Sequence, residues 1–148
     1  MDNDGILREI RRRVGDVDGI LDPAEIDQSN IFWYQYMDSA NVHLAATNII
    51  TATYIVNSGT GISPDTTIID GLLIATWSVA HYLSADVSTK VRSGELGIRF
   101  KSGQDELSTV EAAKKIESAA DRAEKEFRAY VNIKLADPGG ILAASRAQ

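Results

Sequence analysis

Residues 108–131 read Ser108-Thr-Val-Glu-Ala-Ala-Lys-Lys-Ile-Glu-Ser-Ala-Ala-Asp-Arg-Ala-Glu-Lys-Glu-Phe-Arg-Ala-Tyr-Val131 and predict a long helix. Ser108 suits the N-cap position, and Glu111 stands where a capping box has its acidic residue. Small and apolar side chains then recur at alternating spacings of three and four residues, at Ala113, Ile116, Ala120, Ala123, Phe127 and Tyr130. This pattern indicates a narrow apolar seam, and its alanines predict close packing against a neighbouring helix.

The segment before this helix is short, basic and alternating. Apolar residues alternate with glycine or basic residues from Leu96 to Lys101. A period of two predicts a strand, so we expect a short β-hairpin or extended arm over about residues 87–103. This arm is locally basic on an acidic chain. It is therefore either a solvated hairpin or a contact loop for an acidic partner surface or a phosphate backbone.

The composition excludes several kinds of site. The chain has 148 residues, a formal net charge of -6 and no cysteine. The lack of cysteine excludes disulfides, thiolate zinc sites and cysteine nucleophiles. The acidic balance disfavours a freestanding nucleic-acid-binding domain. The polar N-terminal residues differ from a secretory signal, so we expect a protein of the reducing cytoplasm.

No membrane span is expected from the sequence. No apolar run reaches the ~20 residues that a span needs. Polar residues interrupt the best candidate at Asp38, Asn41, His43 and Asn48.

Four helices are predicted, over residues 4–14, 22–57, 63–83 and 108–135. Pro23 and Pro64 suit the first helical position of the second and third helices. The second half of the second helix is apolar nearly all round, so we expect it in the middle of a bundle. The predicted fold class is mainly α, a four-helix bundle-like domain (residues 1–135) with the short hairpin or arm and a flexible C-terminal tail (residues 136–148).

No catalytic or metal-binding motif stands out. His43 and His81 are the only histidines, and they lack the spacing of a metal-binding pair. Asp70 lies near the His81 face of its predicted helix, so an enzyme that uses these two residues stays an alternative. We expect no catalytic residue, no metal and no cofactor, and we therefore infer function from shape and assembly.

The order of the segments resembles the head-to-tail connector (adaptor, or head-completion) proteins of tailed bacteriophages. The matching stretches are Leu21-Asp-Pro-Ala-Glu-Ile26, and Gly97-Ile-Arg-Phe-Lys-Ser-Gly103 before a Ser/Thr-capped helix rich in alanine and lysine. In that family an N-terminal helix, two core helices, a loop or hairpin, a charged helix and a tail follow one another. The resemblance covers about residues 4–135 and is architectural rather than catalytic.

The resemblance implies a structural virion protein without enzymatic activity, located in the neck of the phage and present in the host cytoplasm during assembly. About a dozen copies, expected as a dodecamer, would form a ring beneath the portal protein. The ring would extend the channel through which genomic DNA passes without sequence-specific binding. It would also attach the tail, or a stopper or terminator protein, and no membrane would be involved.

The resemblance also implies two sets of contact residues. Contacts to a neighbouring subunit or ring would fall on Lys90, Arg92, Leu96, Ile98, Arg99, Phe100 and Lys101. Portal docking would fall on Pro138, Gly139, Gly140, Ile141, Leu142 and Arg146.

Two other functions stay open. One is a tail-terminator or neck ring protein, which shares the size and acidity of an adaptor. The other is a freestanding helical bundle that binds a peptide or small ligand near Trp33, Tyr36, Trp77 and His81.

Overall fold

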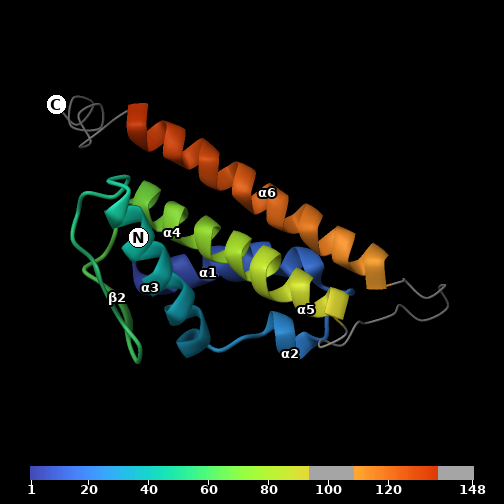
Figure 1. The fold of residues 1–148 in the computed structure, drawn as a ribbon. Helices are drawn as coiled ribbons and strands as arrows, with labels where there is room; N and C mark the ends of the chain where they lie inside the picture. Colours follow the sequence, from blue (N-terminus) through green and yellow to red (C-terminus); the bar gives the residue numbers. More distant parts are fainter. Residues whose placement is uncertain (94–108, 137–148) are drawn as a thin grey trace.

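The computed structural model in Figure 1 describes residues 1–93 and 109–136, and these residues are mainly helical. In chain order the elements are α1 (Asn3–Val14), the 3-10 turn η1 (Gly15–Val17), α2 (Pro23–Ile26), α3 (Asn30–Ala46), β1 (Ile55–Asn57), β2 (Gly61–Ser63), α4 (Ile68–His81), the π-helical segment η2 (Tyr82–Val87), α5 (Ser88–Ser93) and α6 (Thr109–Ala136). The mainly α fold class predicted from the sequence is confirmed.

Helix α4 lies in the middle of the bundle. Helices α1, α3 and α6 all pack against it, with α6 along one side and α1 and α3 on others (Figure 1). Its side chains are therefore buried almost all round, including the polar Asp70, Thr76 and Ser78. The hydroxyls of Thr76 and Ser78 each donate to the backbone carbonyl four residues earlier, which satisfies them inside the core. The prediction that the second half of the 22–57 segment would occupy this central place was wrong.

The helical stretch Ile68–Val91 is long and apolar enough to cross a membrane by length and composition alone. From the sequence, we took the segment interrupted at Asp38 and Asn48 as the best candidate and did not single out this stretch. In the structure 61% of its apolar window is buried inside the bundle, as expected for a core helix.

The single helix predicted over residues 22–57 is broken twice. Helix α2 ends after four residues, and α3 starts afresh where the Ser29 hydroxyl accepts a hydrogen bond from the Phe32 amide (3.2 Å). Helix α3 ends at Ala46, close to Asn48, whose φ is 60°. Asparagine tolerates this left-handed conformation and so ends the helix as glycine often does. The following residues are rich in isoleucine and threonine, which favour extended backbone.

A β-hairpin follows where the sequence suggested helix and loop. Strands β1 and β2 pair antiparallel, with Asn57 opposite Gly61. The side chain of Asn57 accepts hydrogen bonds from the amides of Gly59 and Thr60, which closes the turn. Gly61 has a φ of 90°, a conformation that glycine adopts without strain.

The third predicted helix is shifted and extended. Helix α4 begins four residues after Pro64, where the Thr67 hydroxyl accepts from the Asp70 amide (3.2 Å). Ile68, the first residue of α4, is 68% exposed. Beyond His81 the chain stays helical through α5 to Ser93, so an arm that begins at residue 87 is wrong. The rest of the predicted arm, residues 94–103, lies outside the described residues.

Helix α6 confirms the apolar seam read from the sequence. The seam residues Ala113, Ile116, Ala120, Ala123 and Phe127 are buried, and Tyr130 is half-buried. Helix α6 packs chiefly against α4, and the small seam residues allow the two helices to approach closely.

Candidate interaction surfaces

The structure places only two of the predicted contact residues. Lys90 lies exposed on α5, and Arg92 belongs to the same helix. The other predicted contact residues lie outside the described residues; they are Leu96, Ile98, Arg99, Phe100 and Lys101 in the arm, and Pro138, Gly139, Gly140, Ile141, Leu142 and Arg146 in the tail. The structure does place α6, which joins these two segments of the sequence.

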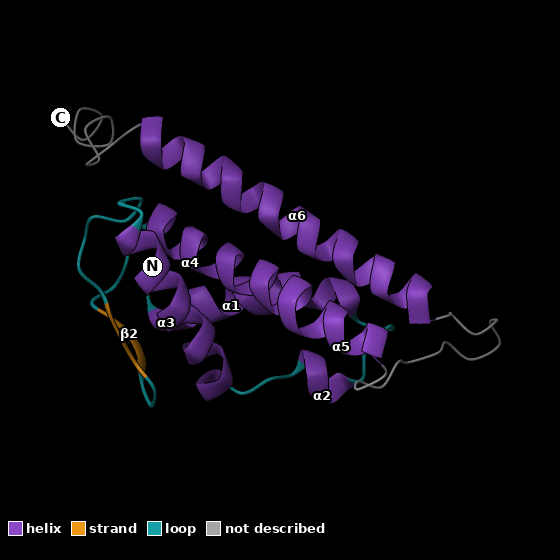
Figure 2. Ribbon diagram, in the orientation of Figure 1, coloured by secondary structure: helices purple, strands orange, loops and turns teal. Residues whose placement is uncertain are grey.

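Helix α6 separates the two predicted contact segments by its whole length. Residues 94–108 lead directly into Thr109, and residues 137–148 follow directly after Ala136. With 28 residues, α6 is about 42 Å long, and its ends lie at opposite ends of the bundle (Figures 1 and 2). The chain therefore leaves the described fold at two poles, one beside α5 and one beside the start of α4.

At one pole a buried carboxylate fastens the last turn of α6. Asp70 accepts a hydrogen bond from the Tyr54 hydroxyl (2.7 Å) and an ion-paired one from Lys134 Nζ (3.0 Å). The exposed fraction of the side chain is 1% for Asp70 and 13% for Lys134. Burial, and then the hydrogen bond and charge of Asp70, raise the pKa of Tyr54 to about 12. The network joins the loop before β1, the start of α4 and the end of α6.

A second ion-pair network fastens α1 to the middle of α6. Arg13 is buried and donates to the carboxylates of Glu9 (2.7 Å) and Glu126 (2.9 Å). The hydrogen bond from Arg13 is the largest influence on Glu9, and it holds the pKa of Glu9 below its ordinary value. Burial alone would lower the pKa of Arg13, but its bonds to Glu126 and Glu9 outweigh burial and raise it.

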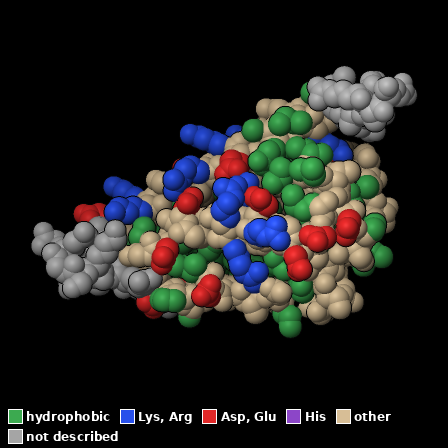
Figure 3. Space-filling model, turned by 180° about the vertical axis from the view of Figure 1, so that it is seen from behind, with side chains coloured by type: hydrophobic (Ala, Val, Ile, Leu, Met, Phe, Trp, Pro, Cys, Tyr) green, Lys and Arg blue, Asp and Glu red, His purple; other side chains and the backbone are tan. Residues whose placement is uncertain are grey.

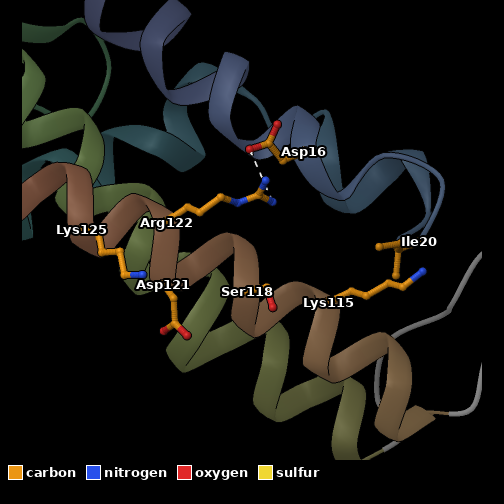
Figure 4. Close-up of a pocket in the computed structure, with 7 residues that line it drawn as sticks. All are labelled: Asp16, Ile20, Lys115, Ser118, Asp121, Arg122 and Lys125. Carbon is orange, nitrogen blue, oxygen red and sulfur yellow. Dashed lines mark ion pairs between the residues drawn. The ribbon is translucent and has the colours of Figure 1, made fainter.

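A cleft lies between α6 and the turn that follows α1 (Figure 4). Its volume is ≈ 550 Å³, and its lining residues are Asp16, Ile20, Lys115, Ser118, Asp121, Arg122 and Lys125. Lys115, Arg122 and Lys125 share one side of α6, because their spacings of seven and three residues return to the same face. Arg122 approaches Asp16 at 3.8 Å, whereas Lys115 and Lys125 take part in no ion pair with any described residue.

Positive charge is confined to part of the chain. Residues 14–89 contain nine acidic residues and neither lysine nor arginine. The cations of the described chain therefore come from α1, α5 and α6. Figure 3, which views the molecule from behind, shows lysine and arginine side chains gathered across the middle of one face with acidic side chains among them.

The aromatic residues form two clusters rather than one pocket. Trp33 is fully buried and packs edge-on against Phe32 and Tyr82, with Tyr36 beside it. Burial raises the pKa of Tyr82 to about 12, and its hydroxyl donates to the Glu25 carbonyl (2.5 Å).

The second cluster is half-exposed. Trp77 stacks on His81 with ring centroids 3.7 Å apart, and His43 lies near the same indole. Within the described residues no ring contact joins the two clusters, so the predicted ligand pocket near Trp33, Tyr36, Trp77 and His81 is not assembled as one site.

The alternative enzyme site at His81 and Asp70 is also not assembled. The two residues stand 11 positions apart on α4, which is about 16 Å along the helix axis. His81 Nδ1 bonds to the Trp77 carbonyl, while Asp70 is engaged by Tyr54 and Lys134. Among residues 1–93 and 109–136, no group of three or more acidic or histidine side chains could hold a metal ion.

Sequence reasoning missed the residues that fasten α6. Arg13 follows Ile6 and Ile10 at spacings that place it on the buried face of α1, and this periodicity could have marked it. Asp70 likewise precedes the buried Leu73 and Ile74 on one face of α4. Their partners lie 113 and 64 residues away, so no local pattern could identify them.

Comparisons with protein-family models, with curated proteins and with solved structures find no match for this chain.

Proposed function

We propose that the protein is a structural, non-enzymatic component of a tailed-phage virion. It acts as a head-to-tail connector, or adaptor. Copies of the chain form a ring, expected to be a dodecamer, beneath the portal protein in the neck. The ring extends the DNA channel and gives the tail, or a stopper or terminator protein, a surface to attach to.

The observation that carries this proposal is the position of the two ends of α6. A connector subunit has to contact partners above and below it, as well as its neighbours in the ring. The two predicted contact segments join α6 at ends about 42 Å apart, and each junction is close to a well-packed part of the bundle. One rigid helix thus links a basic segment at one pole to the C-terminal segment at the other.

The charge distribution also suits a DNA channel. The chain has a net charge of -6, and residues 14–89 carry no cation. A surface without lysine or arginine repels the phosphate backbone, so DNA passes without being held.

The experiment that tests the proposal is docking to the portal protein of the same phage. The full chain and a truncation after Ala136 are each mixed with assembled portal, and the complexes are viewed by electron microscopy. We expect a ring on the portal with the full chain and none with the truncation. The truncation after Ala136 retains every helix of the described fold. The two proteins should therefore give the same helical circular dichroism signal per molecule, so a loss of docking would not reflect unfolding.

A point variant separates the tail sequence from the tail length. Replacing Ile141 and Leu142 by serine should abolish docking, whereas Gln148→Ala, the matched control at the chain end, should leave it intact. A truncated chain that still docks overturns the assignment of residues 137–148. If the full chain does not dock but caps the end of a purified tail tube, the protein is a tail terminator instead.

A further inference from the structure

Helix α3 has the composition of a covered helix, although one of its faces is open. Only one of its 17 residues, Asp38, carries a formal charge, whereas 11 of the 28 residues of α6 do. Ile31 and Val42 of α3 are nevertheless 58% and 61% exposed. A helix with so little charge on its outer face is typical of a helix that another surface covers.

The aromatic residues of α3 point to a protein partner. Phe32, Trp33, Tyr34 and Tyr36 all lie in its first two turns, and Phe32 and Tyr36 are only half-buried. The core of a protein–protein interface is depleted of charged residues and enriched in aromatic ones. Figure 1 shows α3 on the outer side of α4, with α4 between it and α6, so this face of α3 is open in the described fold.

The outer face of α3 is shaped as a ridge between two hollows. The ridge is formed by exposed residues four positions apart, which are Ile31, Gln35, Ser39 and His43. A hollow of ≈ 210 Å³ lies on the side of Phe32 and Tyr36, and one of ≈ 310 Å³ lies on the side of Tyr34 and Asp38, with Val56 of β1 in its wall. Ridges of one helix pack into the grooves of another, so this face can receive a copy of itself.

The middle of this face offers one donor and one acceptor that the described chain leaves free. The side-chain amide of Gln35 and the carboxylate of Asp38 are exposed and make no hydrogen bond or ion pair within the described residues. In a two-fold contact, residue i of one copy meets residue j of the other, and j meets i. Gln35 of each copy can therefore donate to Asp38 of the other, which gives two equivalent hydrogen bonds.

We propose that two copies of the chain associate through α3 across a two-fold axis, with the two helices antiparallel. The ridge of each copy enters the larger hollow of the other, and the axis passes between Gln35 and Asp38. A contact of this kind closes on itself, so it makes a pair and not a longer chain of copies. The pair is a form of the free protein, and it does not rest on the proposed ring.

The contact should be of moderate strength and insensitive to salt. With 17 residues, α3 is about 25 Å long, and one pair of such helices covers less than the ~800 Å² per partner of a standard interface. The contact is mostly uncharged, so ionic screening changes it little. We therefore expect a monomer–dimer equilibrium with a dissociation constant between about 1 μM and 1 mM, and we expect it to persist at high salt.

The first test measures self-association of the full chain and of charge variants of α3 by sedimentation velocity. Gln35→Glu places a new carboxylate against Asp38 of the other copy and should raise the dimer dissociation constant about tenfold or more. Adding Asp38→Lys should restore association, because the new glutamate of each copy then meets the new lysine of the other. Loss of folding would not be rescued in this way, and the circular dichroism of each variant checks the fold. If the second substitution does not restore association, the proposed contact is wrong.

A matched control adds the same charge elsewhere. Ser118→Glu introduces a carboxylate at an exposed position of α6 and should dimerise as the wild type does. If this control weakens self-association as much as Gln35→Glu does, net charge is responsible and the proposed contact is wrong.

Because the chain has no cysteine, a second test can be specific to one position. Ser39→Cys places a single thiol on the ridge, close to the proposed axis, and a short bifunctional maleimide should link two copies through it. Ser118→Cys, on α6, should stay unlinked under the same conditions. Equal linkage of the two variants, or no linkage through Ser39→Cys, overturns the contact.

The outcomes separate this inference from the proposed function. A wild-type chain that stays monomeric up to about 1 mM overturns the pair. So does a chain that forms only larger oligomers without linkage at position 39. Docking on the portal tests the adaptor proposal independently. A dimer that does not dock overturns the adaptor proposal alone, whereas a monomer that docks overturns the pair alone.

Discussion

At Asp70 a single carboxylate joins three parts of the chain. Its two oxygens bond Tyr54 and Lys134, and its own amide bonds the Thr67 hydroxyl that caps α4. A buried carboxylate without partners is costly, so the ion pair with Lys134 and the hydrogen bond from Tyr54 stabilise Asp70 in the core. The same pair holds the end of α6 against the start of α4.

We predict that the two halves of this ion pair respond differently to substitution. Lys134→Met leaves the Asp70 carboxylate buried with Tyr54 as its remaining side-chain partner, and should lower the free energy of unfolding by about 3–5 kcal/mol. Asp70→Asn removes the buried charge, and Lys134 can turn toward solvent. This variant should therefore cost less, about 1–3 kcal/mol. Urea unfolding of both variants checks the order, and equal losses would contradict it.

From the raised pKa of Tyr82 we predict how the free energy of unfolding changes at alkaline pH. Its pKa is raised to about 12 by burial, whereas in the unfolded chain it is near 10. Between these values the unfolded chain loses the proton and the folded chain keeps it, so stability falls as pH rises. Tyr82→Phe should be less stable at pH 8 by about 1 kcal/mol, because the bond to Glu25 is lost.

The gap between wild type and Tyr82→Phe should narrow as pH rises from 10 toward 12, since only the wild type loses this contribution. Thermal unfolding at matched ionic strength measures the gap. If the stability difference between wild type and Tyr82→Phe stays constant with pH, the pKa of Tyr82 is the same in the folded and unfolded chains and the prediction is wrong. The stability gap between wild type and Tyr54→Phe should narrow over the same pH range, because the pKa of Tyr54 is also raised to about 12.

At the scale of elements, α6 was the most predictable part of the fold. Its seam repeats over more than four turns, and its residues from Ala113 to Phe127 are buried while Tyr130 at the end is half-buried. Long periodic patterns average out local exceptions. Helix α1 was also predicted well, because Asp2 caps it and Ile6, Ile10 and Val14 define one buried face.

The segment between α1 and α4 was predicted poorly for a physical reason. Its breakers are Ser29, Asn48 and Asn57, which act through side-chain bonds or a left-handed conformation rather than through proline or glycine. Such residues also occur inside helices, so sequence alone does not distinguish the two uses. The hairpin is short and its strands have no long alternating pattern, which removes the usual strand signal.

We predict that Phe127→Ala lowers the free energy of unfolding by about 3–5 kcal/mol, because the ring is part of the seam buried against α4. Ala129→Ser, two residues along on the exposed side of α6, is the matched control and should change stability by less than about 0.5 kcal/mol. Chemical denaturation measures both. An unchanged Phe127→Ala protein would mean that the seam is not core.

At the scale of the whole molecule, we predict that stability requires the chain as far as Lys134 and does not require residues 137–148. Truncation after Ala136 retains the bond to Asp70 and should leave the unfolding midpoint unchanged. Truncation after Ile133 removes only three further residues but leaves Asp70 without its cation. We expect this shorter chain to lose about 3–5 kcal/mol, as measured by denaturant unfolding. A similar loss for both truncations would place residues 137–148 in the folded unit.

The contact surfaces could be predicted from the sequence only in part. The basic segment and the tail were recognised from composition, but the cleft depends on Asp16 and Ile20 lying opposite α6 in space. The distance along the chain between these residues and Lys115 hides that arrangement. The larger hollow beside α3 likewise depends on Val56 of β1 lying next to that helix, which no local pattern shows.

The two tryptophans give the molecule a pair of independent optical probes. Trp33 is sealed among rings in the core, so its emission should be blue-shifted and resist acrylamide until the bundle unfolds. Trp77 is half-exposed on His81, so its emission should be red-shifted and open to the quencher. Any partner that covers the face between α3 and α4 would shield Trp77 alone. Fluorescence of the unlabelled chain can therefore report unfolding and surface coverage as separate signals in one cuvette.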